Sequence, residues 1–103
     1  MRKARVFVDG HLAGELQEIE KGKHYRFEYL PAYKGPSVSL EMPVSQLVYI
    51  YDRFPPFFEG LLPEGIMLDG LLRQTKIDRD DLMGQLIAVG QDVVGNVTIE
   101  ASE

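Results

Sequence analysis

The first third of the chain alternates apolar and polar residues with a period of two. This alternation covers residues 4–8, 11–16 and 25–29, and it is typical of half-buried β-strands. Asp9-Gly10 separates the first two segments, where a two-residue hairpin turn requires residues that accept positive φ. The segment 25–29 carries its aromatic residues on one face, which we expect to point into the core. The pattern therefore predicts a hairpin followed by a third strand.

Three later segments also have strand character, at residues 38–42, 47–51 and 93–99. The first alternates apolar residues with serine and glutamate and ends at Pro43, because proline cannot continue the interior of a strand. The second is apolar or aromatic throughout, and the third is rich in β-branched residues. Gly95, within the third, predicts a β-bulge or the close approach of another backbone.

Apolar residues recur at helical spacing in the second half of the chain. Residues 57–62 predict one short helix, and the two prolines before it suit a first helical turn. A second helix is expected from beyond Pro63 to near Lys76. It contains Gly65 and Gly70, each of which lowers helix propensity by about 1 kcal/mol relative to alanine, so it should depend on packing for its stability.

A third helix is expected to begin near Asp78, which precedes Asp81 by three residues as in a capping box, and to end at Gly90. Its predicted buried stripe consists of Leu82, Met83, Leu86 and Ile87. Together these patterns predict an α+β fold. We expect one domain over residues 1–103, with an antiparallel sheet of roughly five strands packed against about three helices.

Composition excludes several classes of protein. The 103 residues contain no cysteine, which rules out disulfides, thiol catalysis and cysteine-ligated metals. The net charge of -5 argues against direct nucleic-acid binding, and the small basic cluster of Arg2, Lys3 and Arg5 is interpreted as a solvated strand edge. No apolar run reaches the roughly 18 residues of a membrane span, so we expect no membrane partner and a cytoplasmic protein.

Residues with catalytic or metal-binding chemistry are scarce. His11 and His24 have no partners at ligand spacing and are interpreted as surface histidines. The acidic group at residues 78–81 lacks the spacing of a calcium loop and fits a helix N-terminus better. The serines at 37, 39 and 45 have no nearby histidine to act as a base, and no glycine-rich phosphate loop is present. We therefore expect no enzyme activity, no cofactor and no metal.

Two segments resemble the N-terminal domain of HipA-type toxin kinases. Residues 57–65 read Phe-Phe-Glu-Gly-Leu-Leu-Pro-Glu-Gly, and residues 90–95 read Gly-Gln-Asp-Val-Val-Gly. The hairpin segment 9–14, Asp-Gly-x-x-x-Gly, and the segment 25–33 fit the same family pattern. Asn96 departs from it, because the family more often has a small apolar residue there. The resemblance runs over essentially the whole chain, except for the unaligned run of residues 47–53.

In HipA-type kinases the kinase body follows this domain, whereas this chain ends at Glu103. A free-standing form is similar to HipS, the small component of HipB–HipS–HipT toxin–antitoxin systems, in which the kinase HipT lacks the domain. The resemblance therefore implies a non-catalytic antitoxin that binds and restrains a HipT-like serine/threonine kinase whose known targets are aminoacyl-tRNA synthetases. It also implies a DNA-binding HipB-like protein as a further partner.

A surface on the helical side is the candidate kinase-binding site, because it carries more large apolar residues than one short helix can bury beneath the sheet. The candidate residues are Tyr51, Phe54, Phe57, Phe58, Glu59, Leu61, Leu62, Glu64, Ile66 and Met67. The acidic members, with Asp69, would give this surface a negative rim suited to a basic loop of the kinase. The competing interpretation of each apolar residue is an ordinary place in the core.

Two other functions remain open on the sequence alone. The chain is alternatively a detached N-terminal structural module of a HipA-type kinase, and a neighbouring kinase gene that lacks the domain would argue against that alternative. It is alternatively a small ligand-binding domain, and a buried polar pocket with a strongly shifted titratable group would favour that one.

Overall fold

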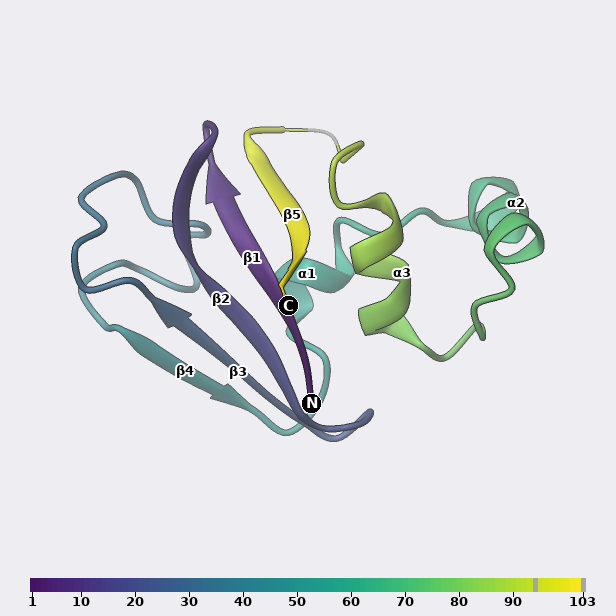
Figure 1. The fold of residues 1–103 in the computed structure, drawn as a ribbon, viewed down its shortest axis with the longest axis horizontal. Coiled ribbons are helices and arrows are strands. Elements are labelled where there is room, and N and C mark those ends of the chain that lie inside the picture. Colours follow the sequence, from purple (N-terminus) through teal and green to yellow (C-terminus); the bar gives the residue numbers. More distant parts are fainter. Residues whose placement is uncertain (94, 103) are drawn as a thin grey trace.

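Five antiparallel strands form one sheet in the order β4-β3-β2-β1-β5 (Figure 1). The computed structural model describes residues 1–93 and 95–102. The strands are β1 (Arg2–Val8), β2 (His11–Glu20), β3 (His24–Tyr29), β4 (Val48–Tyr51) and β5 (Val97–Ser102). The predicted sheet of about five strands is confirmed.

The predicted hairpin joins β1 to β2. Asp9 and Gly10 both have positive φ, at 50° and 80°, as a two-residue turn between twisted strands requires. Val8 pairs with His11 across the turn, and the register shifts between Val6 and Phe7, which marks a β-bulge. The turn therefore sets the pairing from which the rest of the sheet extends.

One face of the sheet supplies most of the core. The apolar residues of β1 that alternate with Arg5 and Phe7 are fully buried there, and so are the three aromatic residues of β3, as the alternation predicts. Phe27 and Tyr29 pack edge to face with ring centroids 4.8 Å apart. The buried strand residues on this face are Ala4, Val6, Val8, Ala13, Leu16, Tyr25, Phe27, Tyr29, Val97 and Ile99.

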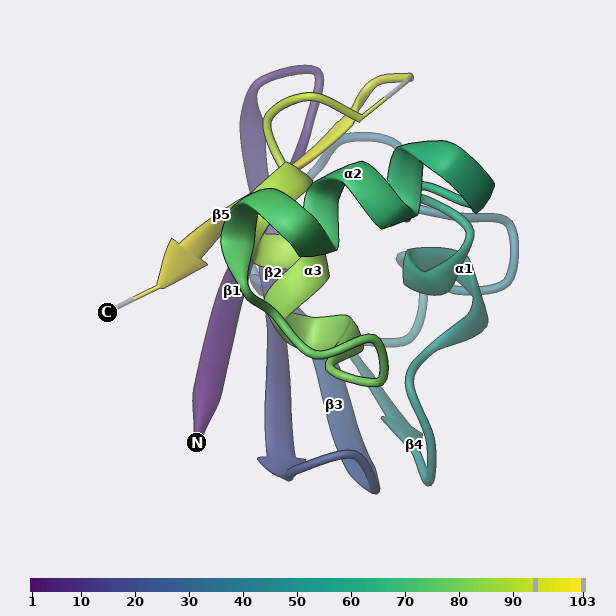
Figure 2. The ribbon, with the colours of Figure 1, turned by 90° about the vertical axis from the view of Figure 1, so that its right-hand side faces the viewer.

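Three helices lie on the same side of the sheet: α1 (Pro56–Glu59), α2 (Gly65–Thr75) and α3 (Leu82–Val89). Helix α3 buries Met83, Gln85 and Leu86 against the sheet, while α2 lies beyond α3 as an outer layer (Figures 1 and 2). The α+β class with about three helices is confirmed. Helix α1 is shorter than predicted: it is a single turn, and the chain turns away at Gly60.

The strand predicted at residues 38–42 is wrong. Residues 39–42 form a tight turn closed by one isolated bridge, with Val38 and Met42 buried and Leu40 99% exposed. The hydroxyl of Tyr29 accepts a hydrogen bond from the amide of Val38 at 2.8 Å and donates to the carbonyl of Met42. Because this side chain satisfies the backbone groups at both ends, the segment does not need a strand partner.

The position of β1 also corrects the interpretation of the basic N-terminus. Strand β1 pairs with β2 on one side and with β5 on the other, so it is a central strand and not a solvated edge. At the other side of β5, the amide of Ile99 donates to the carbonyl of Gly90 at 2.9 Å, and the side chain of Gln91 donates to the carbonyl of Ile99 at 3.2 Å. This edge of the sheet is thus partly closed by the segment that follows α3.

The last strand begins later than expected. Strand β5 starts at Val97, not at residue 93, and Gly95 lies in the bend before it with φ 110°. A Cβ at Gly95 would meet no atom within 4 Å, so this glycine serves a positive-φ bend and neither a strand bulge nor a close backbone contact. Val94, which belonged to the predicted strand, lies outside the described residues.

Candidate protein-docking surface

The segment that leaves β4 divides between core and surface. Phe54 and Phe58 are buried: Phe54 packs edge to face on Tyr25 with centroids 5.3 Å apart, and Phe58 lies 5.9 Å from Phe27. Pro55, also buried, precedes α1 with an extended backbone that directs the helix onto the sheet. For Phe54 and Phe58 the core interpretation is therefore the correct one, and their side chains do not form part of an exposed surface.

The remaining candidates form a gradient from half-buried to fully exposed. Four of them pack partly against the core, namely Tyr51, Phe57, Leu61 and Leu62. Glu59 and Glu64 are exposed. Ile66 and Met67, in the first turn of α2, are 88% and 75% exposed. The structure thus places the largest exposed apolar groups of the predicted surface on α2.

These exposed residues border an open groove of about 790 Å³, which we call the α2 groove. Helix α2 and the turn before it form one wall, and the segment that follows α3 forms the other. The lining residues are Gly60, Leu61, Leu62, Pro63, Ile66, Met67, Gly70, Leu71, Arg73, Gln74, Val89, Asp92 and Val93. A groove lined mainly by apolar side chains with a few charged ones is typical of a protein-binding site.

Sequence reasoning missed the second wall of the groove. Val89, Asp92 and Val93 follow the candidate segment by about thirty residues and reach it only because α3 packs on the sheet. One signal was available in the sequence, because residues 90–95 belong to the segment that resembles the family pattern. In the structure a Cβ at Gly90 would lie 2.3 Å from the carbonyl oxygen of Ile99, so only glycine fits so close to β5.

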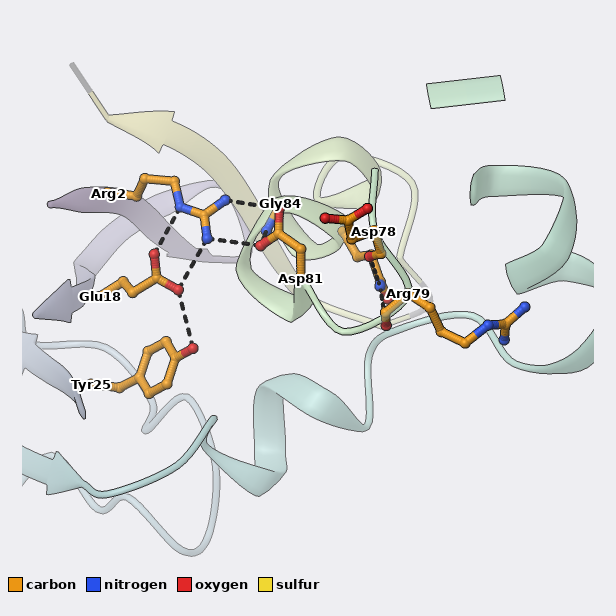
Figure 3. Close-up of polar contacts among 8 residues, drawn as sticks. Arg2, Glu18, Tyr25, Asp78, Arg79, Asp81 and Gly84 are labelled. Carbon is orange, nitrogen blue, oxygen red and sulfur yellow. Dashed lines mark hydrogen bonds and ion pairs between the residues drawn. The ribbon is translucent and has the colours of Figure 1, made fainter. Parts of the chain in front are cut away.

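A polar cluster fixes the N-terminus of α3 to the sheet (Figure 3). Arg2 on β1 donates from Nε to Glu18 Oε1 at 2.8 Å and from Nη2 to Asp81 Oδ1 at 2.7 Å. Tyr25 donates its hydroxyl to Glu18 Oε2 at 3.1 Å, and Asp81 accepts from the amide of Gly84 at 3.1 Å. The N-cap of α3 is therefore Asp81, and the predicted cap at Asp78 is wrong.

The same contacts shift the ionisation of these groups. The hydrogen bond from Arg2 lowers the pKa of Asp81, and the reciprocal bond raises the pKa of Arg2. Burial, with the hydrogen bond to Glu18, raises the pKa of Tyr25 to about 12. These three groups lie in the cluster beside α3 and do not line the α2 groove.

The buried amide of Gln85 fixes the loop that enters α3. Its Nε2 donates to the backbone carbonyls of Asp78 and Arg79 at 3.1 and 2.8 Å. His11 and His24 are exposed, as interpreted from the sequence. Within residues 1–93 and 95–102 no group of three or more histidine, aspartate or glutamate residues is arranged to hold a metal ion. The described helices include none long and apolar enough to cross a membrane.

These features define a small α+β domain whose helical side presents an apolar groove and whose polar clusters serve the fold. The family model for the HipA N-terminal domain matches residues 4–100. The chain belongs to the HipA N-terminal domain family.

Two relatives extend this result. A solved structure of the N-terminal domain of HipA toxin superposes with a TM-score of 0.77 at 29% sequence identity, covering 100% of this chain and 94% of that one. An uncharacterized protein of Haemophilus influenzae is 33% identical over 100 residues, which span 97% of this chain and 92% of that protein. The domain therefore occurs in a natural protein of nearly this size as well as in a toxin.

Proposed function

We propose that this chain is an antitoxin-type subunit that binds a HipA/HipT-like serine/threonine kinase and restrains it without catalysing a reaction itself. The observation that carries the proposal is the exposure of Ile66 and Met67 beside the α2 groove, in a chain that belongs to the HipA N-terminal domain family. Exposed apolar groups bordering an apolar groove are a typical starting point for a stable protein contact.

The size of the Haemophilus influenzae relative supports a function in trans. That protein is 92% covered by this chain, so it has little room for a kinase body of its own. A domain that packs against a kinase body within one chain retains an apolar contact face when it is a separate protein. Binding in trans must then overcome an association cost of roughly 4 to 15 kcal/mol, which calls for a sizeable apolar contact.

Charge around the α2 groove favours a partner with a basic surface. Glu59 and Glu64 are exposed on the approach to α2. Asp69, expected in the same rim, instead forms an ion pair with Arg79 at 2.7 Å. Glu59 and Glu64 therefore face the partner together with Asp92 of the groove lining, which also contains Arg73. Opposite charges at the rim of an interface raise the association rate and fix orientation more than they raise affinity. A basic loop of the kinase fits this rim.

A HipB-like DNA-binding protein is the further partner that we propose, and the net charge of -5 leaves any contact with DNA to that protein.

Co-expression with a HipT-like kinase that lacks this domain tests the proposal. We expect the chain to restore growth and to co-purify with the kinase. Met67→Asp or Glu64→Arg should raise the dissociation constant at least tenfold, about 1.4 kcal/mol, without changing the melting curve of the free chain. Leu40→Asp is the matched control, because Leu40 is also apolar and exposed but lies in the loop before β4, outside the α2 groove.

Binding by Met67→Asp at wild-type affinity, with a normal melting curve, would remove this surface from consideration. Failure of the wild-type chain to associate with any such kinase would overturn the proposed function itself.

The second candidate function is a structural module of a longer HipA-type kinase, acting in cis. The specific observation in its favour is the match to the N-terminal domain of HipA toxin, 94% of which this chain covers. A kinase encoded beside this chain that already carries its own N-terminal domain would favour the module, whereas the antitoxin requires a kinase that lacks it.

A further inference from the structure

Helix α2 is the least anchored element of the fold. None of its eleven residues is buried, and it forms an outer layer beyond α3 (Figure 2). Its apolar residues Leu68, Leu71 and Leu72 are partly buried. At its start, Glu64 provides no side-chain cap for the first amides. Its described ion pair, between Asp69 and Arg79, is exposed to solvent on both sides.

The intrinsic stability of α2 is low. Eleven residues fall short of the roughly 12 to 15 at which isolated helices become marginal in water. Gly70 reduces the helix equilibrium about fivefold relative to alanine. In proteins most helix stability comes from packing an apolar face, and the residues on the groove side of α2, Met67 and Leu71, line an open groove.

We propose that the folding of α2 is coupled to partner binding: the helix opens locally in the free chain and is secured when an apolar segment of the kinase fills the α2 groove. This inference rests on the proposed function and adds how that site is regulated. The filled groove would cover Met67 and Leu71 from α2 and Val89 and Val93 from the opposite wall in one contact. Binding then includes the cost of ordering α2, so a variant with a more stable helix should bind more tightly.

Two glycines of α2 provide a matched pair of variants. Gly70 has no positive φ, and a Cβ there would meet no atom within 4 Å, so Gly70→Ala should stabilise the helix about fivefold. A Cβ at Gly65 would also meet no atom within 4 Å, but Gly65 has φ 59°. Gly65→Ala therefore adds the same methyl group while straining the backbone, and it should destabilise the first turn. Neither change touches the core.

Amide hydrogen exchange on the whole free chain tests the first half of the inference. We expect the amides of residues 69–75 to exchange at least a hundredfold faster than the buried amides of α3 and β1. Gly70→Ala should slow exchange in α2 about fivefold, Gly65→Ala should accelerate it, and neither should alter β1. Exchange in wild-type α2 as slow as in α3 would overturn the inference, whatever the partner does.

Exchange in the presence of the HipT-like kinase tests the second half. We expect α2 to gain protection in the complex, and Gly65→Ala, which does not line the groove but weakens the helix, to raise the dissociation constant. A complex that forms while exchange in α2 stays unchanged would overturn this inference and leave the proposed function standing. Absence of any complex, with fast exchange in free α2, would instead overturn the proposed function and the coupling together.

Discussion

Helices α2 and α3 are neighbours in the chain, yet their surroundings differ completely. Helix α3 has eight residues, buries three of them and begins at a capped, ion-paired aspartate. Helix α2 has eleven residues, a smaller proportion of them apolar, and buries none. The comparison teaches that a helix enters the core when a high apolar content is combined with contacts that hold it to the sheet. In α3 those contacts are made through Arg2 at its start and Gly90 at its end.

The largest expected difference between the two helices is in the free energy of unfolding after an apolar side chain is truncated to alanine. Leu86→Ala in α3 removes a fully buried group and should lower the free energy of unfolding by about 2–5 kcal/mol. Met67→Ala in α2 should change it by no more than about 0.5 kcal/mol, because Met67 is largely exposed. Urea unfolding of both variants measures the difference, and equal losses would contradict the assignment of α2 to the surface.

Removal of the cap is the next test. Asp81→Ala eliminates the bond to the Gly84 amide and one partner of Arg2, and it should cost about 1–2 kcal/mol. Asp78→Ala is the matched control, because the helix is capped by Asp81 and the contact of residue 78 with Gln85 uses its backbone carbonyl. We expect a change within about 0.5 kcal/mol for the control. A larger loss of unfolding free energy in Asp78→Ala would indicate that Asp78 caps α3, as the sequence predicted.

Protonation of Asp81 at low pH should weaken the contact between α3 and Arg2, as the Asp81→Ala change does. Because Arg2 lowers the pKa of Asp81 in the folded chain, the charged carboxylate stabilises the fold at neutral pH. That contribution is fully present above the unfolded pKa of about 4 and is lost as the pH falls through the lower folded value. The stability difference between wild type and Asp81→Asn should therefore shrink in this window, as followed by thermal unfolding. A constant difference down to the most acidic pH would contradict the ion pair.

The smallest effect is expected at the ion pair of α2. Asp69 and Arg79 are both largely exposed, so the double change Asp69→Ala with Arg79→Ala should alter the free energy of unfolding by about 0.5 kcal/mol or less. At 1 M salt even this difference should vanish, because the charges are screened over about 3 Å. A loss comparable with that of Asp81→Ala would show that α2 is anchored as firmly as α3.

Much of the sheet was predictable because its signals are local. The alternation at residues 4–8 and 25–29 gives both the strands and their buried face, and Asp9-Gly10 gives the turn. The segment 38–42 misled because its alternation is equally regular, and only the hydroxyl of Tyr29, nine residues away from Val38, shows that its backbone is satisfied in a turn.

The site was less predictable because it is assembled over long separations. One wall of the α2 groove contains Met67 and the other contains Val89 and Val93, and no local pattern pairs them. The motif around residues 57–65 predicted a surface on the helical side, but the pattern could not tell Phe58, which is buried, from Met67, which is exposed. That distinction depends on where α1 meets the sheet and where α2 leaves it.

The contact between Gly90 and Ile99 has a consequence for self-association. A strand at the margin of a sheet can template the addition of identical strands from other molecules, which is how amyloid-like fibrils grow. Here the amide and the carbonyl in the middle of β5 already bond to residues 90 and 91 of the same molecule. The β5 edge therefore offers no continuous template, and the chain is protected there against the addition of further strands. The α2 groove on the helical side remains accessible to a partner.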